Sequence, residues 1–312
     1  MPVTDKTSRA PSYLGREVEE FLRYLRQTKG LADNTLAAYG NDLNQFARFL
    51  EDRKETSWDV GKRTVAEFLN YLVRREYQPS SQARKLAAVK GMYRYLKAEG
   101  RAQVDPTKGL GGTKVTKKRP TVISVAEVDQ LLAEAALART PEGYRDSAML
   151  ELLYATGMRV SELVAVDVDD VDFETGEVVC GRGGERQRPL PFGARAGHAV
   201  KLYVRSWRRR ILRSPEEAAL FLNHRGRRLT RQGFWLIIKG HASAAEIDTA
   251  ITPHTLRHSF ATHRLRGDTP IPEVQSLLGH ASPATTQIYV ELAREKGSLE
   301  AVLPGTAGHR SK

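Results

Sequence analysis

The chain has 312 residues, which is enough for two domains that each bury a core. Its formal net charge of +12 and pI of about 9.8 favour a polyanionic partner, and no long basic amphipathic helix or lipidation signal favours a membrane surface instead. The single cysteine, Cys180, excludes an internal disulfide framework and fits a reducing compartment. Because the first fifteen residues have no apolar core and no apolar run approaches the length of a membrane span, we expect a cytoplasmic protein.

Residues 16 to 100 show the apolar spacing of four amphipathic helices. Thr64 and Glu67 predict a capping box at the start of the third helix. The fourth helix carries a basic row opposite its apolar positions, made of Arg84, Lys90, Arg94 and Lys97. Such a row is usually a solvated face, but on a basic protein it equally fits DNA phosphates.

Residues 105 to 120, "DPTKGLGGTKVTKKRP", have no apolar periodicity and predict a basic linker. Its charge includes Lys114, Lys117 and Lys118. A plain tether explains the glycines but not the charge, so we expect a strap that helps two domains close around nucleic acid.

From Thr121 onward the pattern is mostly helical. Ser124 opens a helix with a capping box, Gly157 breaks a later apolar helix, and Ser161 is the expected cap of the next one. "GEVVCGRGGERQRPLP" predicts a β-hairpin that turns on Gly183 and Gly184, with Cys180 as a small buried residue rather than a nucleophile.

The stretch "TPHTLRHSFATH", residues 252 to 263, begins a helix at Thr252 and Pro253. His254 and Arg257 are one turn apart, and together with the helix N-terminus they favour an anion, of which phosphate is the commonest. Two alternatives are a solvated surface cluster and a metal site that uses the i, i+4 pair His254 and His258. The fixed charge of Arg257 and the lack of a glutamate after His254 count against metal.

Further segments of this half carry residues that could converge with that stretch. They are "ATGMRVSEL", "LLGHASP" and "SPATTQIYVEL", and the candidates in chain order are Arg159, His254, Arg257, His280 and Tyr289. The order and spacing resemble the tyrosine recombinase (phage integrase) family, and "HTLRHSFATH" and "LLGHASPATTQIY" are similar to its Xer-like branch. "NTLAAYGNDLNQFARFL" resembles the helical core-binding domain of that family. The resemblance extends from about residue 16 to 303.

The resemblance implies a mainly α fold. It implies a four-helix SAM-like core-binding domain over residues 16–104, the basic linker over 105–120, and an α+β catalytic domain over 121–303 with a small β-hairpin sheet. It also implies that the end of the chain, with Leu292, Leu299, Val302 and Leu303, docks on a neighbouring protomer. The alternative is a helix packed on its own domain.

The same resemblance assigns the chemistry. Tyr289 would be the nucleophile, Arg159 and Arg257 would clamp the phosphate oxygens, His254 would transfer protons and His280 would hold the phosphate, with no metal or other cofactor. The family places a lysine in the β-hairpin as general acid. Here Arg182 takes that place in a loop one residue shorter, and an arginine gives up its proton very reluctantly.

The resemblance therefore implies a site-specific recombinase that cuts and rejoins double-stranded DNA through a 3′-phosphotyrosyl intermediate and a Holliday junction. It implies a homo-tetramer, or a hetero-tetramer with a paralogous recombinase, and chromosome-dimer resolution as its role. Three alternatives stay open: an integrase of a mobile element, a type IB topoisomerase-like enzyme, and a DNA-binding protein whose catalysis has decayed at Arg182.

Overall fold

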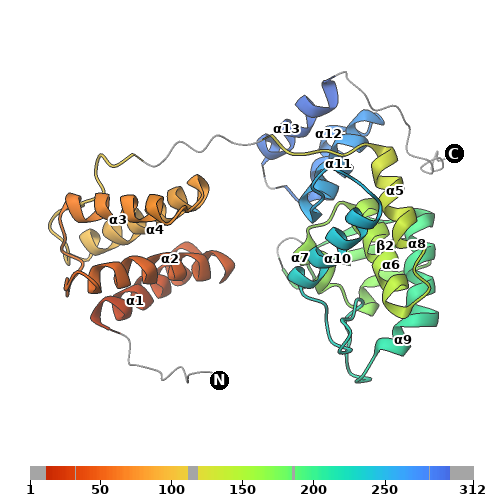
Figure 1. The fold of residues 1–312 in the computed structure, drawn as a ribbon, viewed down its shortest axis with the longest axis horizontal. Coiled ribbons are helices and arrows are strands. Elements are labelled where there is room, and N and C mark those ends of the chain that lie inside the picture. Colours follow the sequence, from red (N-terminus) through yellow and green to blue (C-terminus); the bar gives the residue numbers. More distant parts are fainter. Residues whose placement is uncertain (1–11, 32, 112–118, 185–186, 281, 296–312) are drawn as a thin grey trace. The chain divides into compact units, whose positions relative to one another are not determined.

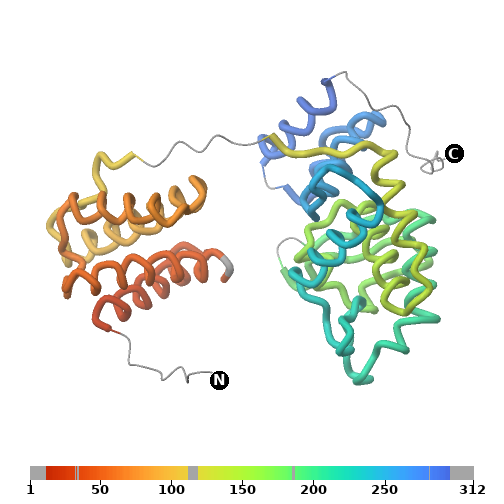
Figure 2. The backbone as a smooth tube through the Cα atoms, in the orientation of Figure 1, coloured from red at the N-terminus to blue at the C-terminus, as the bar shows by residue number. Residues whose placement is uncertain are grey.

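A computed structural model describes residues 12–31, 33–111, 119–184, 187–280 and 282–295. The chain divides into two compact units, Met1–Lys118 and Arg119–Lys312. Figure 1 labels the α-helices of each unit and strand β2, and Figure 2 traces the same backbone as a tube. The predicted architecture, mainly helical with one small antiparallel sheet, is confirmed.

The first unit contains the four predicted helices: α1 (Tyr13–Lys29), α2 (Asp33–Glu51), α3 (Lys62–Arg74) and α4 (Pro79–Ala98). Their apolar stripes meet in one core that includes Phe46, Phe68 and Tyr93. The predicted capping box at Thr64 is wrong. The helix begins two residues earlier after Gly61, and the Glu67 carboxylate pairs with Arg53 and Arg63 instead.

A buried carboxylate ties α2 to α4. Asp42 is almost fully buried and accepts a hydrogen bond from Lys85 Nζ at 2.8 Å. Arg84 pairs with the other oxygen of the same carboxylate, and its side chain remains 45% exposed. Burial of an unpaired carboxylate is strongly unfavourable, so these two cations are what allow Asp42 to lie there.

The second unit begins with α5 (Val125–Ala135), α6 (Pro141–Thr156) and α7 (Val160–Ala165). A short 3₁₀ turn, η1 (Val168–Asp170), leads into a sheet of order β1-β2-β3, formed by β1 (Val171–Asp172), β2 (Glu177–Cys180) and β3 (Arg188–Pro191). The chain continues through α8 (Gly193–Leu202), the π-helical turn η2 (Tyr203–Trp207) and α9 (Arg208–Ile211). The last helices are α10 (Arg231–Ala244), α11 (Pro253–Arg266), α12 (Ile271–Leu278) and α13 (Pro283–Arg294).

The hairpin forms as predicted, because β2 pairs antiparallel with β3 in the register Val178↔Leu190. Gly183 has φ of 74°, a left-handed conformation that glycine adopts without steric conflict. Cys180 is buried at the end of β2, and burial raises the pKa of its thiol to about 11, which keeps the sulfur protonated and unreactive. Its predicted role as a small buried residue is therefore confirmed.

Helix α6 packs against α5, α8 and α11, so it supports most of the second unit. Its C-terminal residues Leu152 and Leu153 are fully buried in the larger core. A smaller core around Phe260, Leu278 and Tyr289 joins α11, α12 and α13. Tyr289 therefore lies among packed helices and not on an open surface.

A histidine joins α10 to two other helices. His241 Nδ1 lies 2.5 Å from Glu134 Oε2 of α5, and its Nε2 lies 3.4 Å from Asp146 Oδ2 of α6. The hydrogen bond to Asp146 contributes most to raising the pKa of this imidazole, burial opposes it, and Glu134 adds to it. The cationic form of His241 thus stabilises the junction of the three helices.

Within the described residues, no helix is both long and apolar enough to cross a membrane.

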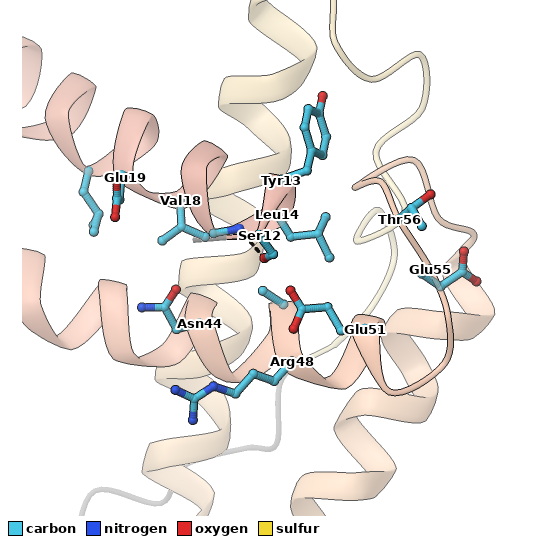
Figure 3. Close-up of a pocket in the computed structure, with 13 residues that line it drawn as sticks. Ser12, Tyr13, Leu14, Val18, Glu19, Asn44, Arg48, Glu51, Glu55 and Thr56 are labelled. Carbon is cyan, nitrogen blue, oxygen red and sulfur yellow. Dashed lines mark hydrogen bonds between the residues drawn. The ribbon is translucent and has the colours of Figure 1, made fainter. Parts of the chain in front are cut away.

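The first unit has a hollow between the start of α1 and the second half of α2 (Figure 3). At its edge, Ser12 Oγ accepts a hydrogen bond from the Gly15 N–H. Its lining contains none of the candidate site residues.

Candidate active site

The start of α11 positions two of the candidate residues. Thr252 is the N-cap, as predicted, and its Oγ1 accepts a hydrogen bond from the Thr255 N–H at 3.1 Å. From this start, His254 faces solvent, whereas Arg257 is 5% exposed and lies in the interior. No hydrogen bond joins these two side chains among the described residues. The two residues expected on one face of the helix therefore differ, because one is exposed and the other is buried.

Arg257 is held by backbone carbonyls from two other helices. Its Nη1 donates to the carbonyl of Gly157 at 2.5 Å, and its Nη2 donates to the carbonyl of Leu278 at 2.6 Å. The same Nη2 lies 3.2 Å from His280 Nε2. These bonds fix the plane of the guanidinium and leave its other N–H groups for an anion.

Arg159 is the N-cap residue of α7, and Ser161 is not, because the helix begins at Val160. Its Nη1 donates to Glu162 Oε1 at 3.0 Å and its Nη2 to the carbonyl of Gly279 at 3.4 Å. The Glu162 carboxylate also accepts from the Arg159 backbone N–H at 2.7 Å. One carboxylate therefore orients both the backbone and the side chain of this arginine.

A third arginine, which the sequence did not single out, completes the cluster. Arg188 at the start of β3 donates to both oxygens of Glu162 at 3.2 Å, and its Nε donates to the carbonyl of Leu277 at 3.0 Å. Burial alone would raise the pKa of Glu162, but the hydrogen bonds from Arg188 and Arg159 outweigh it and hold that pKa below its usual value. Glu162 stays ionised and balances part of the positive charge.

The end of α12 and its C-cap Gly279 thus supply three successive carbonyls to three arginines. Leu277 accepts from Arg188, Leu278 from Arg257 and Gly279 from Arg159. The C-terminal carbonyls of a helix have no intrahelical partners and carry partial negative charge, so they suit cationic donors.

Tyr289, in the second turn of α13, is 4% exposed, and its hydroxyl lies 2.8 Å from His258 Nδ1. The His280 ring stacks at 6.1 Å between ring centroids, with an interplanar angle of 15°. Burial raises the pKa of the Tyr289 phenol, while the charges of Arg257 and Arg159 oppose that shift. The phenol is therefore protonated at neutral pH.

His280 follows Gly279, which ends α12 with φ of 60°. Its Nδ1 lies 2.9 Å from Thr286 Oγ1, and because Arg257 donates to its Nε2, the proton of the neutral ring is on Nδ1. Burial first, and then the charges of Arg257, Arg159 and Arg188, lower the pKa of His280 to about 4. Burial and the charge of Arg159 also lower the pKa of Arg257 to about 10, so that arginine remains charged at neutral pH.

The structure brings together Arg159, Arg257, His280 and Tyr289, and it places His254 next to this group. The His254 ring lies 6.3 Å from the ring of His258, centroid to centroid. Arg182 is found elsewhere on the hairpin: its Nη2 donates to the carbonyl of Asp169 at 3.1 Å, and its Nε pairs with Asp170. Among the described residues, no hydrogen bond or ion pair joins Arg182 to the other five candidates.

The candidate DNA-contacting residues differ in whether their side chains already bond to other groups of the protein. Arg84 is engaged by Asp42, and Lys90 Nζ donates to the carbonyl of Leu110 at 2.8 Å. Arg94 is exposed, with Nε 3.3 Å from the carbonyl of Lys90. The three linker lysines, Lys114, Lys117 and Lys118, lie outside the described residues.

Sequence reasoning missed three residues of this cluster: Glu162, Arg188 and His258. The i, i+4 spacing of His254 and His258 did draw attention to His258, but only as a metal ligand. Among the described residues, no group of three or more histidine, cysteine, aspartate or glutamate side chains could hold a metal ion. The arrangement instead offers three anchored guanidinium groups, two neutral imidazoles and a phenol, which together can bind an anion and transfer protons.

Comparison with known proteins agrees with the geometry. Residues 121–296 match the phage integrase family, and residues 18–100 match the phage integrase N-terminal SAM-like domain. The chain is 46% identical to the tyrosine recombinase XerC of Herpetosiphon aurantiacus over 90% of this chain and 92% of that protein. It is 37% identical to the tyrosine recombinase XerD of Halalkalibacterium halodurans over 91% of this chain and 95% of that protein.

Solved structures show the same fold. A crystal structure of the XerH site-specific recombinase bound to a palindromic difH substrate matches with a TM-score of 0.70 and 19% identity, covering 93% of this chain and 96% of that chain. A lambda integrase dimer bound to a COC′ core site matches with a TM-score of 0.70 and 18% identity, covering 92% and 99%. With these matches over both units, the chain belongs to the phage integrase family, as an Xer-like tyrosine site-specific recombinase.

Proposed function

We propose that this recombinase cuts and rejoins double-stranded DNA through a covalent link between Tyr289 and a 3′ phosphate. The observation that carries the proposal is the burial of the Tyr289 hydroxyl among His258, His280 and two arginines held on backbone carbonyls. A phosphodiester of tyrosine retains the energy of the broken DNA bond, so the exchange needs no nucleotide and no metal.

Each side chain has a distinct part in the proposal. Arg159 and Arg257 stabilise the charge that develops on the non-bridging phosphate oxygens, and their fixed orientation makes that stabilisation effective. His254, at the exposed edge, is the residue to which the resemblance assigns proton transfer. His280 holds the phosphate. Its Nε2 accepts from Arg257 in the free protein, so donation to phosphate requires its proton to move from Nδ1 to Nε2.

Arg182 keeps a more limited role. Its guanidinium, paired with Asp170, can donate hydrogen bonds to a DNA phosphate but is a poor general acid. We assign it to stabilising charge near the leaving 5′ oxygen, which then takes its proton from water. This role is supported by the position of Arg182 in the hairpin turn, where the family has its lysine.

We further propose that three segments of the chain have different functions. Residues 16–104 form the core-binding domain, 105–120 a basic linker and 121–303 the catalytic domain with its C-terminal interaction tail. The net charge of +12 supports double-stranded DNA as the partner. Four protomers, of this chain alone or with a paralogous recombinase, would exchange strands through a Holliday junction at one recombination site.

The proposed biological role is chromosome-dimer resolution in the cytoplasm, and the similarity to proteins named XerC and XerD supports it. Genome-wide mapping of covalently trapped protein tests both the chemistry and the role. We expect one locus in cells that carry the wild-type protein and no covalent adduct with Tyr289→Phe, which should still bind DNA.

The possible contrary results can be told apart. Adducts that survive in Tyr289→Phe would contradict the assignment of the nucleophile. Adducts scattered over many loci would contradict chromosome resolution and leave the chemistry intact. Loss of cleavage in excess chelator, restored by added Mg²⁺, would indicate a metal-dependent nuclease instead.

A further inference from the structure

We propose that His258, and not His254, accepts a hydrogen bond from the Tyr289 hydroxyl in the free protein and takes up its proton during cleavage. This inference rests on the proposed function, because it assumes that Tyr289 attacks the phosphate. It differs from the expectation from sequence, which gave the proton transfer to His254, and it gives a catalytic role to a residue that the sequence considered only as a metal ligand.

The geometry separates the two histidines clearly. His258 Nδ1 lies 2.8 Å from the Tyr289 hydroxyl, within hydrogen-bond distance, and the two rings are 5.5 Å apart between centroids. His254 is exposed one turn earlier on α11, and its ring contacts His258 and not Tyr289 among the described residues. A general base must lie within hydrogen-bond reach of the proton that it removes, and His258 meets that condition.

The surroundings of His258 keep its imidazole neutral. Burial comes first, followed by His254 and the charge of Arg257, and together they lower the pKa of His258 to about 4. From the other side it faces the Tyr289 hydroxyl on α13, with His280 stacked on that ring. A neutral ring that accepts from a phenol at Nδ1 carries its own proton on Nε2. The free protein thus holds a protonated phenol against an unprotonated nitrogen.

A base this weak cannot ionise the phenol in advance, because burial also raises the pKa of Tyr289. The proton can leave only as the bond from the tyrosine oxygen to phosphorus forms, since that bond withdraws electrons and makes the phenol strongly acidic. The incoming phosphate also brings negative charge, which favours protonation of a nearby imidazole. Tyr289 is therefore unreactive until a phosphate occupies the site.

Cleavage forms one bond, breaks one bond and moves two protons. The bond from Tyr289 Oη to phosphorus forms, the phenol proton passes to His258 Nδ1, and the bond from phosphorus to the 5′ oxygen breaks. The 5′ oxygen leaves as a hydroxyl after it takes a proton from water. In rejoining, the 5′ hydroxyl gives its proton to hydroxide as its oxygen bonds to phosphorus, the bond from phosphorus to Tyr289 Oη breaks, and the imidazolium of His258 returns its proton to Tyr289.

The experiment combines a histidine variant with a more acidic nucleophile. His258→Asn keeps an oxygen acceptor near the place of Nδ1 but cannot take up a proton. His254→Asn is the matched control. Each is made with tyrosine at position 289, and again with a fluorinated tyrosine whose phenol ionises near neutral pH. Single-turnover formation of the covalent adduct is measured on a nicked copy of the mapped site, with DNA binding and thermal melting as controls for folding.

With tyrosine, we expect His258→Asn to slow cleavage by about 10²–10⁴-fold, the usual effect of losing a general base. With the fluorinated phenol, most of that loss should disappear, because the proton is already gone. Any loss of cleavage rate in His254→Asn should be the same with either nucleophile.

Three results would overturn the inference. An equal loss in His258→Asn with both nucleophiles would reduce His258 to a positioning residue. A loss in His254→Asn that the fluorinated phenol restores would return the role to His254. Wild-type rates in His258→Asn would exclude any role. Failure of the proposed function is distinct from all three, since the wild-type protein would then form no adduct with either phenol.

Discussion

Gly279 shows how one residue can carry two independent constraints. It ends α12 in a left-handed conformation with φ of 60°, and a Cβ placed on it would lie 2.9 Å from Cζ of Arg188. The guanidinium of Arg188 cannot move aside freely, because it is bonded to Glu162 and to the carbonyl of Leu277. A side chain at this position would therefore disturb the arginine cluster as well as the backbone.

We predict that Gly279→Ala abolishes most DNA cleavage while the protein stays folded. The left-handed backbone should cost about 1–2 kcal/mol of stability with alanine. Gly176→Ala is the matched control, since Gly176 has φ of 73° but nothing within 4 Å of the added Cβ. Both variants should melt at similarly reduced temperatures, and only Gly279→Ala should lose single-turnover cleavage. Equal cleavage by the two variants would show that Arg188 tolerates displacement.

At the scale of single residues, the sequence located candidate side chains better than it predicted how deeply they are buried. The catalytic candidates stay predictions, and the spacing of His254 and Arg257 predicted that they share one face of the helix. Helix α11 is buried almost all round, from Pro253 to His263, so its apolar period does not indicate which side meets solvent. The contact between His258 and Tyr289 joins residues that are far apart in the chain, and no local pattern encodes it.

Among the elements, two predicted helix starts are confirmed and two are wrong. The capping box of Ser124 with Glu127 and the N-cap Thr252 are confirmed, because both depend on hydrogen bonds between neighbours in sequence. The box at Thr64 failed, since Glu67 pairs with Arg53, a partner from another segment. Ser161 failed as a cap because Glu162 bonds to the Arg159 N–H and starts the helix at Val160. A nonlocal ion pair thus overrides one local capping signal, and a competing local hydrogen bond overrides the other.

The junction of α10 with α5 and α6 gives a prediction about pH. The pKa of His241 is raised in the folded protein, so the folded state binds this proton more tightly than the unfolded chain, whose value is near 6.5. The stabilisation is complete below about 6.5 and is lost as pH rises through the folded value. The free energy of unfolding of wild type should exceed that of His241→Gln by about 1 kcal/mol at low pH.

Chemical denaturation of both proteins at several pH values checks this expectation. The difference between them should shrink as pH rises above 6.5 and then level off. A difference that stays constant with pH would mean that His241 acts by packing alone. His198→Gln provides a control for general effects of replacing a histidine, since no hydrogen bond or ion pair involves the His198 side chain within the described part of the chain.

Across the whole molecule, charge determines how the protein should meet DNA. Each phosphate contact that a cation neutralises changes the salt dependence of binding by about 0.9 in the logarithmic slope. Replacing Lys114, Lys117 and Lys118 with glutamine should therefore lower the slope by up to about 3 and weaken binding to all sequences alike. A change in sequence preference with an unchanged slope would show that the linker reads bases.

Two arginines of α4 refine that expectation. Arg94 is exposed, and its replacement by glutamine should lower the slope by about 1. Arg84 is paired with Asp42, so Arg84→Gln should change the slope less and instead reduce stability, because Asp42 is almost fully buried. Binding measured over a range of salt concentrations, together with thermal melting, separates the two. An equal loss of slope would show that Arg84 leaves Asp42 to contact DNA.

The end of α12, with its C-cap Gly279, has a wider consequence. Three neighbouring carbonyls there accept hydrogen bonds from three arginines. A change in the position of this helix therefore cannot reorient one guanidinium without reorienting the other two. Any displacement of α12 would therefore shift all three arginines together. Variation in this short helix should therefore produce recombinases that are either fully competent or inert, and graded activities should come from changes elsewhere in the chain.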